Sequence, residues 1–173
     1  MSITLDGTSG ITSAGTIADA TAVVRPLVSG TSVASTSGTS IDFTSIPSWV
    51  KRITVMFAGV SVSGTAFPMV QLGTSGGIEA TGYLGAAETS LFTTGFYITG
   101  SNVAANIFYG QMIISLIGSN AWVESGVIGY SNAGATAKSG GYKPLSGTLD
   151  RVRITTSNGT DTFDAGSINI LYE

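Results

Sequence analysis

The run Val50–Val60, with the sequence VKRITVMFAGV, carries the strongest β-strand signal in the chain. Ile53, Val55 and Phe57 alternate there with polar residues such as Arg52. Because successive side chains of a strand point to opposite faces, the three apolar side chains are expected to share the face that lies in a core.

Similar runs occur on the C-terminal side of this strand. Phe67–Leu72 follows a Ser-Gly-Thr turn, and Pro68 indicates an edge strand or the first residues of a strand. Ile107–Ile117 and Ala121–Tyr130 are separated only by Gly118-Ser119-Asn120, which is typical of a hairpin connection.

The end of the chain predicts a second hairpin. Arg151–Thr156 and Thr160–Tyr172 flank Asn158-Gly159, a pair that favours the two positive-φ positions of a type I′ turn. Ala165-Gly166 predicts a bulge within the last strand. The glycine-containing residues 131–141 are predicted to form a loop.

These patterns predict an all-β protein whose main unit is an antiparallel β-sandwich of about eight strands, jelly-roll-like in arrangement. No segment has convincing helical periodicity with caps. We assign the sandwich to residues 39–173. Residues 1–38 contain no aromatic residue and many Gly, Ser and Thr, so they are interpreted as an extended N-terminal arm that oligomerises or attaches to a particle.

The composition excludes several kinds of chemistry. Only 10% of the 173 residues are charged, whereas soluble domains average about 25%. The chain has no His and no Cys, so imidazole bases, thiolate metal sites and disulfides are excluded. A net charge of −3 argues against nucleic acid as a partner. No apolar run approaches the ~20 residues of a membrane helix, and the start of the chain resembles no secretory signal, so membrane insertion is not expected.

Several stretches resemble the C-terminal tip domain of tail-fibre proteins from tailed phages and prophages. The resemblance is carried by Gly38–Phe57 (GTSIDFTSIPSWVKRITVMF), Gly76–Gly85 (GGIEATGYLG), Ser146–Thr156 (SGTLDRVRITT) and Asn158–Ile170 (NGTDTFDAGSINI). Ser2–Thr12 is also similar to segments of fibre proteins. The resemblance implies a virion protein that adheres to a glycan on the host cell surface.

Aromatic side chains are the first candidates for contacts with a sugar, since a ring face stacks on C–H groups and a hydroxyl donates a hydrogen bond. Tyr142, which is expected to lie in a Gly-rich loop beside Lys143, is the leading candidate, because exposed loops concentrate binding residues. Trp122 and Tyr130 share a strand face with Glu124, so an exposed face and a core face are equally compatible with the pattern.

Arg151 and Arg153 lie two residues apart on a strand and therefore share a face. They match the chemistry of an acidic glycan, because a guanidinium pairs with a carboxylate or phosphate through two hydrogen bonds. The alternative is an ion pair within or between subunits, with Asp150, Asp161 or Asp164 as the partner.

No metal site, cofactor or catalytic group is predicted. Asp161 and Asp164 do not have the spacing of a calcium loop, and turn chemistry explains them better. Glu79, Glu88 and Glu124 are isolated in sequence, whereas glycan hydrolysis needs a pair of carboxylates. The chain is therefore not expected to be an enzyme.

The function expected from the sequence is that of a phage virion structural protein, a tail-fibre or receptor-binding tip. Its partners would be other copies in a homotrimer, other tail or capsid proteins, and a bacterial surface polysaccharide. It would be made in the host cytoplasm and act on the virion outside the cell. The alternatives are a capsid or virion decoration protein without receptor binding and, as a weaker one, a glycan depolymerase.

Overall fold

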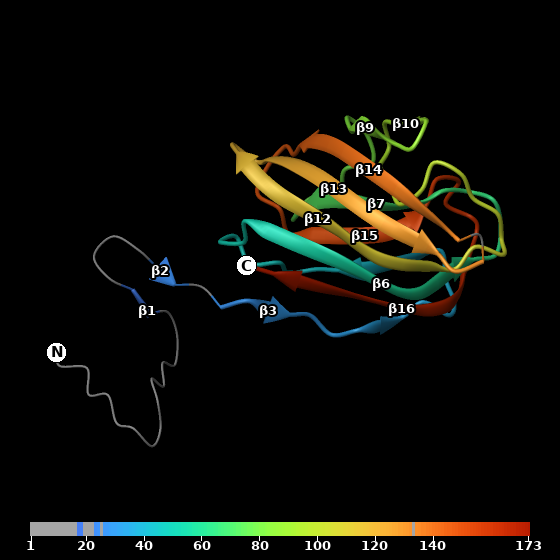
Figure 1. Ribbon diagram of the computed structural model, residues 1–173. Helices are drawn as coiled ribbons and strands as arrows, with labels where there is room; N and C mark the ends of the chain where they lie inside the picture. The colour runs from blue at the N-terminus through green and yellow to red at the C-terminus, as the bar shows by residue number, and fades with distance from the viewer. Residues whose placement is uncertain (1–16, 19–22, 25, 133) are drawn as a thin grey trace, which may run out of the picture.

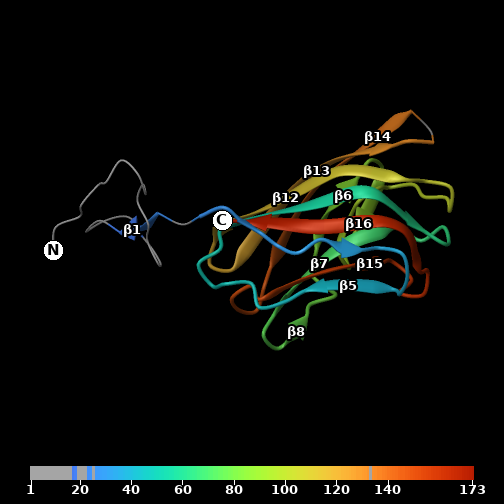
Figure 2. The ribbon, with the colours of Figure 1, turned by 90° about the horizontal axis from the view of Figure 1, so that it is seen from below.

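The computed structural model describes residues 17–18, 23–24, 26–132 and 134–173. Residues 26–132 and 134–173 form two antiparallel sheets packed against each other, seen as two layers in Figures 1 and 2. The predicted all-β class and antiparallel β-sandwich are therefore confirmed. Sixteen strands occur in the described part of the chain instead of about eight, because many are pieces of two to four residues. No helix there is long and apolar enough to cross a membrane.

The first layer is a nine-stranded sheet with the order β10-β9-β14-β13-β12-β6-β16-β3, and β4 also pairs with β16. Its strands are β3 (Val28–Ser29), β4 (Val33–Ala34), β6 (Arg52–Val62), β9 (Leu84–Ala87), β10 (Ser90–Phe92), β12 (Phe108–Gly118), β13 (Ala121–Tyr130), β14 (Ala135–Pro144) and β16 (Phe163–Tyr172). We call it the large sheet.

The second layer, which we call the small sheet, has the order β11-β7-β15-β5, and β8 pairs with β7. Its strands are β5 (Ser40–Phe43), β7 (Pro68–Thr74), β8 (Gly77–Ile78), β11 (Phe96–Tyr97) and β15 (Arg151–Thr156). β1 (Ile17–Ala18) and β2 (Val23–Val24) form a separate two-stranded pair.

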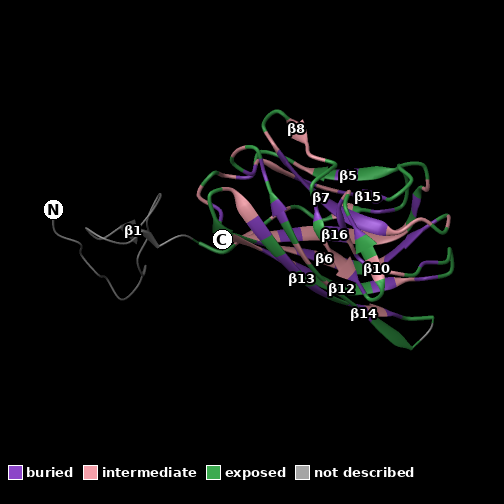
Figure 3. Ribbon diagram, turned by 90° about the horizontal axis from the view of Figure 1, so that it is seen from above, coloured by how far each residue is buried: buried purple, intermediate pink, exposed green. Residues whose placement is uncertain are grey.

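The core lies between the two sheets and follows the alternation of the strands. In β6 the side chains of Ile53, Val55 and Phe57 are buried, as their spacing predicts. Val152 and Ile154 face them from the small sheet as members of the same apolar cluster. Figure 3 shows buried and exposed residues alternating along β13. Each sheet therefore has one inner face and one outer face.

The predicted hairpin between β12 and β13 is confirmed. The two strands pair from Phe108 opposite Tyr130 to Gly118 opposite Ala121. Ser119 and Asn120, at the turn, have φ angles of 47° and 61°. Two consecutive positive φ values match the twist that a type I′ turn gives to a hairpin.

The second predicted hairpin is wrong. β15 pairs with β5 and β7 in the small sheet, whereas β16 pairs with β6, β3 and β4 in the large sheet. In the Asn158-Gly159 pair only Gly159 has a positive φ, of 68°. The Asn158 side chain instead closes the crossing loop, since its Oδ1 accepts hydrogen bonds from the backbone N–H groups of Thr160 and Asp161, each at 3.0 Å. The bulge predicted at Ala165-Gly166 is confirmed by two register shifts between β16 and β6.

The loop predicted at residues 131–141 is also wrong over most of its length, because Ala135–Pro144 is strand β14. Glycines weaken a strand, but pairing with β13 on one side and β9 on the other outweighs that cost. A Cβ at Gly141 would lie 2.7 Å from Cζ of Phe92, so the glycine is needed for the ring to pack there.

The described end of the predicted arm lies along the sandwich. β3 and β4 add to the large sheet at β16, and the Ser35 hydroxyl donates to the carbonyl of Ala165 at 2.7 Å. Hydrogen bonding to the sheet therefore begins before residue 39. Apart from β1 and β2, the rest of the predicted arm lies outside the described residues.

Candidate functional site

The outer face of the small sheet carries polar side chains in register. Arg153 on β15 lies opposite Asp42 on β5 and Gln71 on β7. Two residues further along β15, Thr155 lies opposite Ser40 on β5 and Met69 on β7. The residues between these rows, such as Ile154, point into the core.

An open hollow lies on this outer face and has a volume of about 400 Å³. Buried side chains such as Gln71 and Thr155 line it together with exposed ones such as Ser40 and Asn158. The volume is in the range of small-ligand sites, which is about 300–1,000 Å³. We call this feature the small-sheet hollow.

Hydrogen bonds fix several of the polar groups that line the small-sheet hollow. Gln71 Nε2 donates to the carbonyl of Thr94 at 2.8 Å, and the Thr155 hydroxyl donates to the carbonyl of Thr39 at 2.8 Å. A donating hydroxyl keeps lone pairs that accept hydrogen bonds. These fixed side chains therefore offer acceptors to a ligand without first having to be ordered.

Arg153 and Asp42 form a two-pronged ion pair at the edge of the hollow. Nε of Arg153 donates to Oδ1 at 2.7 Å, and Nη2 donates to Oδ2 at 2.8 Å. The hydrogen bond with Asp42 raises the pKa of the Arg153 guanidinium above its usual value. The pair is neutral overall, so the acidic glycan predicted for Arg153 would have to compete with Asp42. The sequence predicted Asp150, Asp161 or Asp164 as a partner, whereas the partner of Arg153 is Asp42.

Arg151 shares the outer face with Arg153, as predicted, but it does not line the hollow. Its Nη2 atom lies 3.0 Å from Oδ2 of Asp150 and donates to the carbonyl of Ser75 at 3.2 Å. The predicted alternative of an ion pair with Asp150 is therefore confirmed for Arg151.

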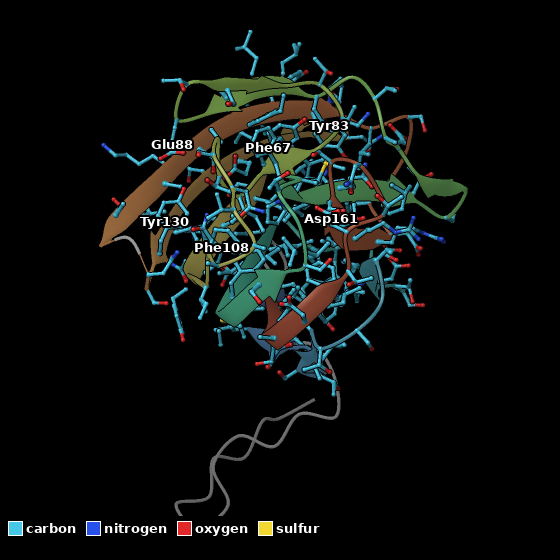
Figure 4. The ribbon with its side chains drawn as sticks, turned by 90° about the vertical axis from the view of Figure 1, so that its right-hand side faces the viewer. Phe67, Tyr83, Glu88, Phe108, Tyr130 and Asp161 are labelled. Atoms are coloured by element: carbon cyan, nitrogen blue, oxygen red, sulfur yellow. The ribbon has the colours of Figure 1, made fainter. Side chains whose placement is uncertain are left out.

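Trp122, Tyr130 and Lys143 lie on the inner face of the large sheet, with exposed fractions of 2%, 9% and 4%. The Tyr130 hydroxyl is hydrogen-bonded to Thr99 and lies near Glu88. Figure 4 shows Tyr130 and Glu88 on the left of the sandwich and Asp161 on the right. The prediction that these three residues contact a surface ligand is wrong. Alternate residues of a strand point to opposite faces of the sheet, and these three point into the interior.

Lys143 ties the two sheets together. Its ammonium lies 2.6 Å from Oε2 of Glu79, just after β8, and 5.4 Å from the centre of the Tyr83 ring. Burial raises the pKa of Glu79, but hydrogen bonds from Lys143 and Ser146 outweigh it and leave the pKa below its usual value. Lys143 is therefore a structural group of the interior.

Tyr142 is exposed to 36%, but it lies on the outer face of the large sheet, opposite Val123 and Leu84. It belongs to β14 and not to a loop, so that part of the prediction is wrong. The small-sheet hollow opens on the other side of the sandwich. The structure thus divides the six predicted site residues among the interior and two opposite faces.

The acidic residues serve separate local contacts. Glu88 accepts a hydrogen bond from the N–H of Gly100 at 3.1 Å, and Asp161 accepts one from the N–H of Ala66 at 2.9 Å. Hydrogen bonds from Asn158 and Ala66 lower the pKa of Asp161. Within the described ranges, no three residues of the types Asp and Glu gather in a way that could hold a metal ion.

Glu124 is the one of these acids with a strongly shifted pKa. Burial raises its pKa to about 7, although the Ser139 hydroxyl donates to Oε1 at 2.8 Å. The second carboxyl oxygen, Oε2, is buried without a hydrogen-bond partner. Glu124 lies in the interior and does not line the small-sheet hollow.

Sequence reasoning found Arg153 but missed the other polar residues of the hollow, notably Gln71, Thr94 and Thr155. The alternation Arg151-Val152-Arg153-Ile154-Thr155 places Thr155 on the face of the arginines, so this residue could have been found. Gln71 and Thr94 come from β7 and the segment before β11, and only the sheet register brings them there.

Comparison with known proteins found no relative of this chain: no family model matches it, and neither does any curated protein or solved structure.

Proposed function

We propose that this protein is a virion structural protein of a tailed phage, a tail-fibre or receptor-binding tip that adheres to a host cell-surface glycan. The contact is made in the small-sheet hollow. The observation that carries this proposal is the lining of the hollow by amide and hydroxyl groups whose positions are fixed by internal hydrogen bonds.

The chemistry of the hollow suits an uncharged saccharide. Sugar hydroxyls are both donors and acceptors, and the lining offers Thr hydroxyls together with the amides of Gln71 and Asn158. The exposed methyl group of Ala80 provides a small apolar surface for sugar C–H groups. Arg153 contributes little net charge there, because Asp42 neutralises it.

An open hollow binds a single sugar weakly, so attachment depends on several copies. A fibre built from several copies presents several hollows, and each virion presents several fibres. Linked weak sites give firm attachment through their effective concentration. The protein would be made in the host cytoplasm and act on the virion after lysis.

The alternative of a virion decoration protein is favoured by a different observation, the nearly uncharged outer face of the large sheet, which suits contact with protein. No observation favours the depolymerase, since Glu79, Glu88 and Glu124 engage Lys143, Gly100 and Ser139 respectively.

The test uses fluorescently labelled protein, a panel of bacterial strains and the surface polysaccharides purified from them. Ala80 is exposed and lines the hollow, so Ala80→Trp fills the space with a large side chain. Ala105→Trp is the matched control, because Ala105 is exposed and is not a lining residue. Tyr142→Ser probes the opposite face.

We expect the wild-type protein, Ala105→Trp and Tyr142→Ser to bind alike, and Ala80→Trp to bind at least about tenfold more weakly, a loss of ~1.4 kcal/mol. Binding to purified virions but to no strain would overturn the receptor-binding proposal in favour of decoration. A fall in polymer viscosity on incubation would instead indicate a depolymerase.

A further inference from the structure

The outer face of the large sheet is broad and presents many apolar side chains to solvent. Cross-strand pairing places Leu84, Tyr142, Val123 and Ser115 in one row, and Lys138, Val127, Gln111 and Met56 in another. Ile113 and Ser125 lie between these rows. We call this surface the large-sheet outer face.

The apolar side chains on this face protrude. Val127, near its middle, is exposed to 59%, and Tyr109 and Ile117 on β12 are exposed by half or more. Single exposed apolar residues are ordinary, but a contiguous group of them on one sheet face marks a contact surface.

Charge on the face is sparse. Lys138 lies on β14 toward one edge, and Arg52 lies at the end of β6, where it is paired with Glu173. The cross-strand rows between them carry uncharged residues. An apolar centre depleted in charge with a polar rim is the usual anatomy of a protein–protein interface.

The same face is also recessed. One hollow of about 150 Å³ is lined by Gln111, Ile113, Ser125 and Val127. A second, of about 290 Å³, is lined by Thr54, Leu171 and neighbouring residues. Protruding side chains and recesses that could receive them thus occur on one surface, which is the property a self-associating face requires.

The area is sufficient for a stable contact. The five long strands β14, β13, β12, β6 and β16 run side by side. At about 4.8 Å per strand and 3.3 Å per residue, they span roughly 24 Å by 30 Å, or about 700 Å². Two such faces together would bury about 1,400 Å², within the 1,200–2,000 Å² of specific interfaces.

We propose that a second copy of this chain covers the large-sheet outer face, so that the protein self-associates through the β12–β13 region. The contact uses the side of the sandwich opposite the small-sheet hollow, so it leaves the hollow open. The inference goes beyond the proposed function and does not depend on any glycan.

The experiment maps the contact with single thiols. Because the chain has no Cys, Val127→Cys introduces the only thiol, on the centre of the face. Val103→Cys is the matched control, because Val103 is 51% exposed and lies in the loop between β11 and β12, outside the large sheet. Maleimide labelling rates are measured at low and high protein concentration, alongside the mass by light scattering. At a concentration where nine in ten copies are associated, the Val127→Cys thiol should react roughly tenfold more slowly, because only free copies expose it.

A charge placed on the face should separate the copies. We expect Val127→Arg to have the mass of one chain while keeping the unfolding midpoint of the wild type, and Val103→Arg to keep the wild-type mass. A wild-type protein that stays monomeric at high concentration overturns the proposal. The proposal is also overturned if Val127→Arg still associates while a variant that lacks residues 1–26 does not. In that case the copies make contact through the N-terminal segment. Loss of polysaccharide binding alone would affect only the proposed function.

Discussion

The two outer faces of the sandwich differ in chemistry although the same alternation builds both. The small sheet presents Gln71, Arg153 and Thr155 around a hollow, whereas the large sheet presents Val123 and Val127 on a broad surface. The alternation along a strand determines which side chains point to solvent, but it does not determine whether those side chains are polar or apolar.

The difference teaches how to divide function between the faces. Fixed amides and hydroxyls hold a small polar ligand, because they replace its hydrogen bonds to water. Exposed apolar side chains gain most when a large surface excludes water from them. We therefore assign the ligand to the small sheet and the second copy to the large sheet.

The largest effect is expected at the ion pair that joins the two layers. Lys143→Ala removes a buried ammonium and leaves the partly buried carboxylate of Glu79 without its cation, so the free energy of unfolding should fall by about 3 kcal/mol. Lys138→Ala is the matched control on the exposed side of β14 and should change it by less than about 0.5 kcal/mol. Urea unfolding measures both. If both variants lose the same free energy of unfolding, the ion pair does not stabilise the contact between the two sheets, and packing alone holds them together.

An effect of similar size is expected at Glu124, on the inner side of the large sheet. Its pKa of about 7 in the folded protein lies above the usual value of 4.5, so the folded state binds the proton more tightly than the unfolded state does. The stabilising contribution is complete below about pH 4.5 and is lost as the pH rises to about 7, amounting to about 3 kcal/mol.

Glu124→Gln removes this titration, and Ser139 still donates to the amide oxygen if that oxygen takes the place of Oε1. Relative to the variant, the wild-type protein should therefore lose stability between pH 4.5 and 7.5. Unfolding by urea at several pH values in that interval measures the difference. Parallel curves for the two proteins would mean that water reaches the carboxyl, and that the inner face is less dry than the burial of Glu124 indicates.

Local patterns were sufficient to predict β6, β12 and β13 of the large sheet and the connection between the last two. The alternation of Ile53, Val55 and Phe57 and the short β12–β13 turn depend on neighbouring residues only, and both are confirmed. β15 and β16 are adjacent in sequence as well, but their pairing is decided by distant strands. β16 pairs with β6 about a hundred residues earlier, and no local signal records this.

The candidate site was less predictable for a related reason. Trp122 and Tyr130 shared a face with Glu124, and a carboxylate is normally a sign of solvent. A carboxyl with a pKa of about 7 is largely protonated below neutral pH, so it fits inside the sandwich beside them. The small-sheet hollow, in contrast, combines residues of β5, β7 and β15 that only the sheet register brings together.

The smallest change in stability, and the sharpest test of the ligand face, is expected from Asp42→Asn. The substitution removes the carboxylate that neutralises Arg153, while both side chains are partly exposed, so the free energy of unfolding should change by no more than about 1 kcal/mol. The hollow then gains a positive charge, and binding of an acidic polysaccharide should increase several-fold at low salt and fall again as salt screens the charge. Asp150→Asn is the matched control: it frees Arg151, which does not line the hollow, and should leave polysaccharide binding unchanged. If polysaccharide binding increases equally in both variants, charge acts over the whole surface and the ligand is not held in the small-sheet hollow. If binding increases only in Asp42→Asn, the ligand lies beside Arg153.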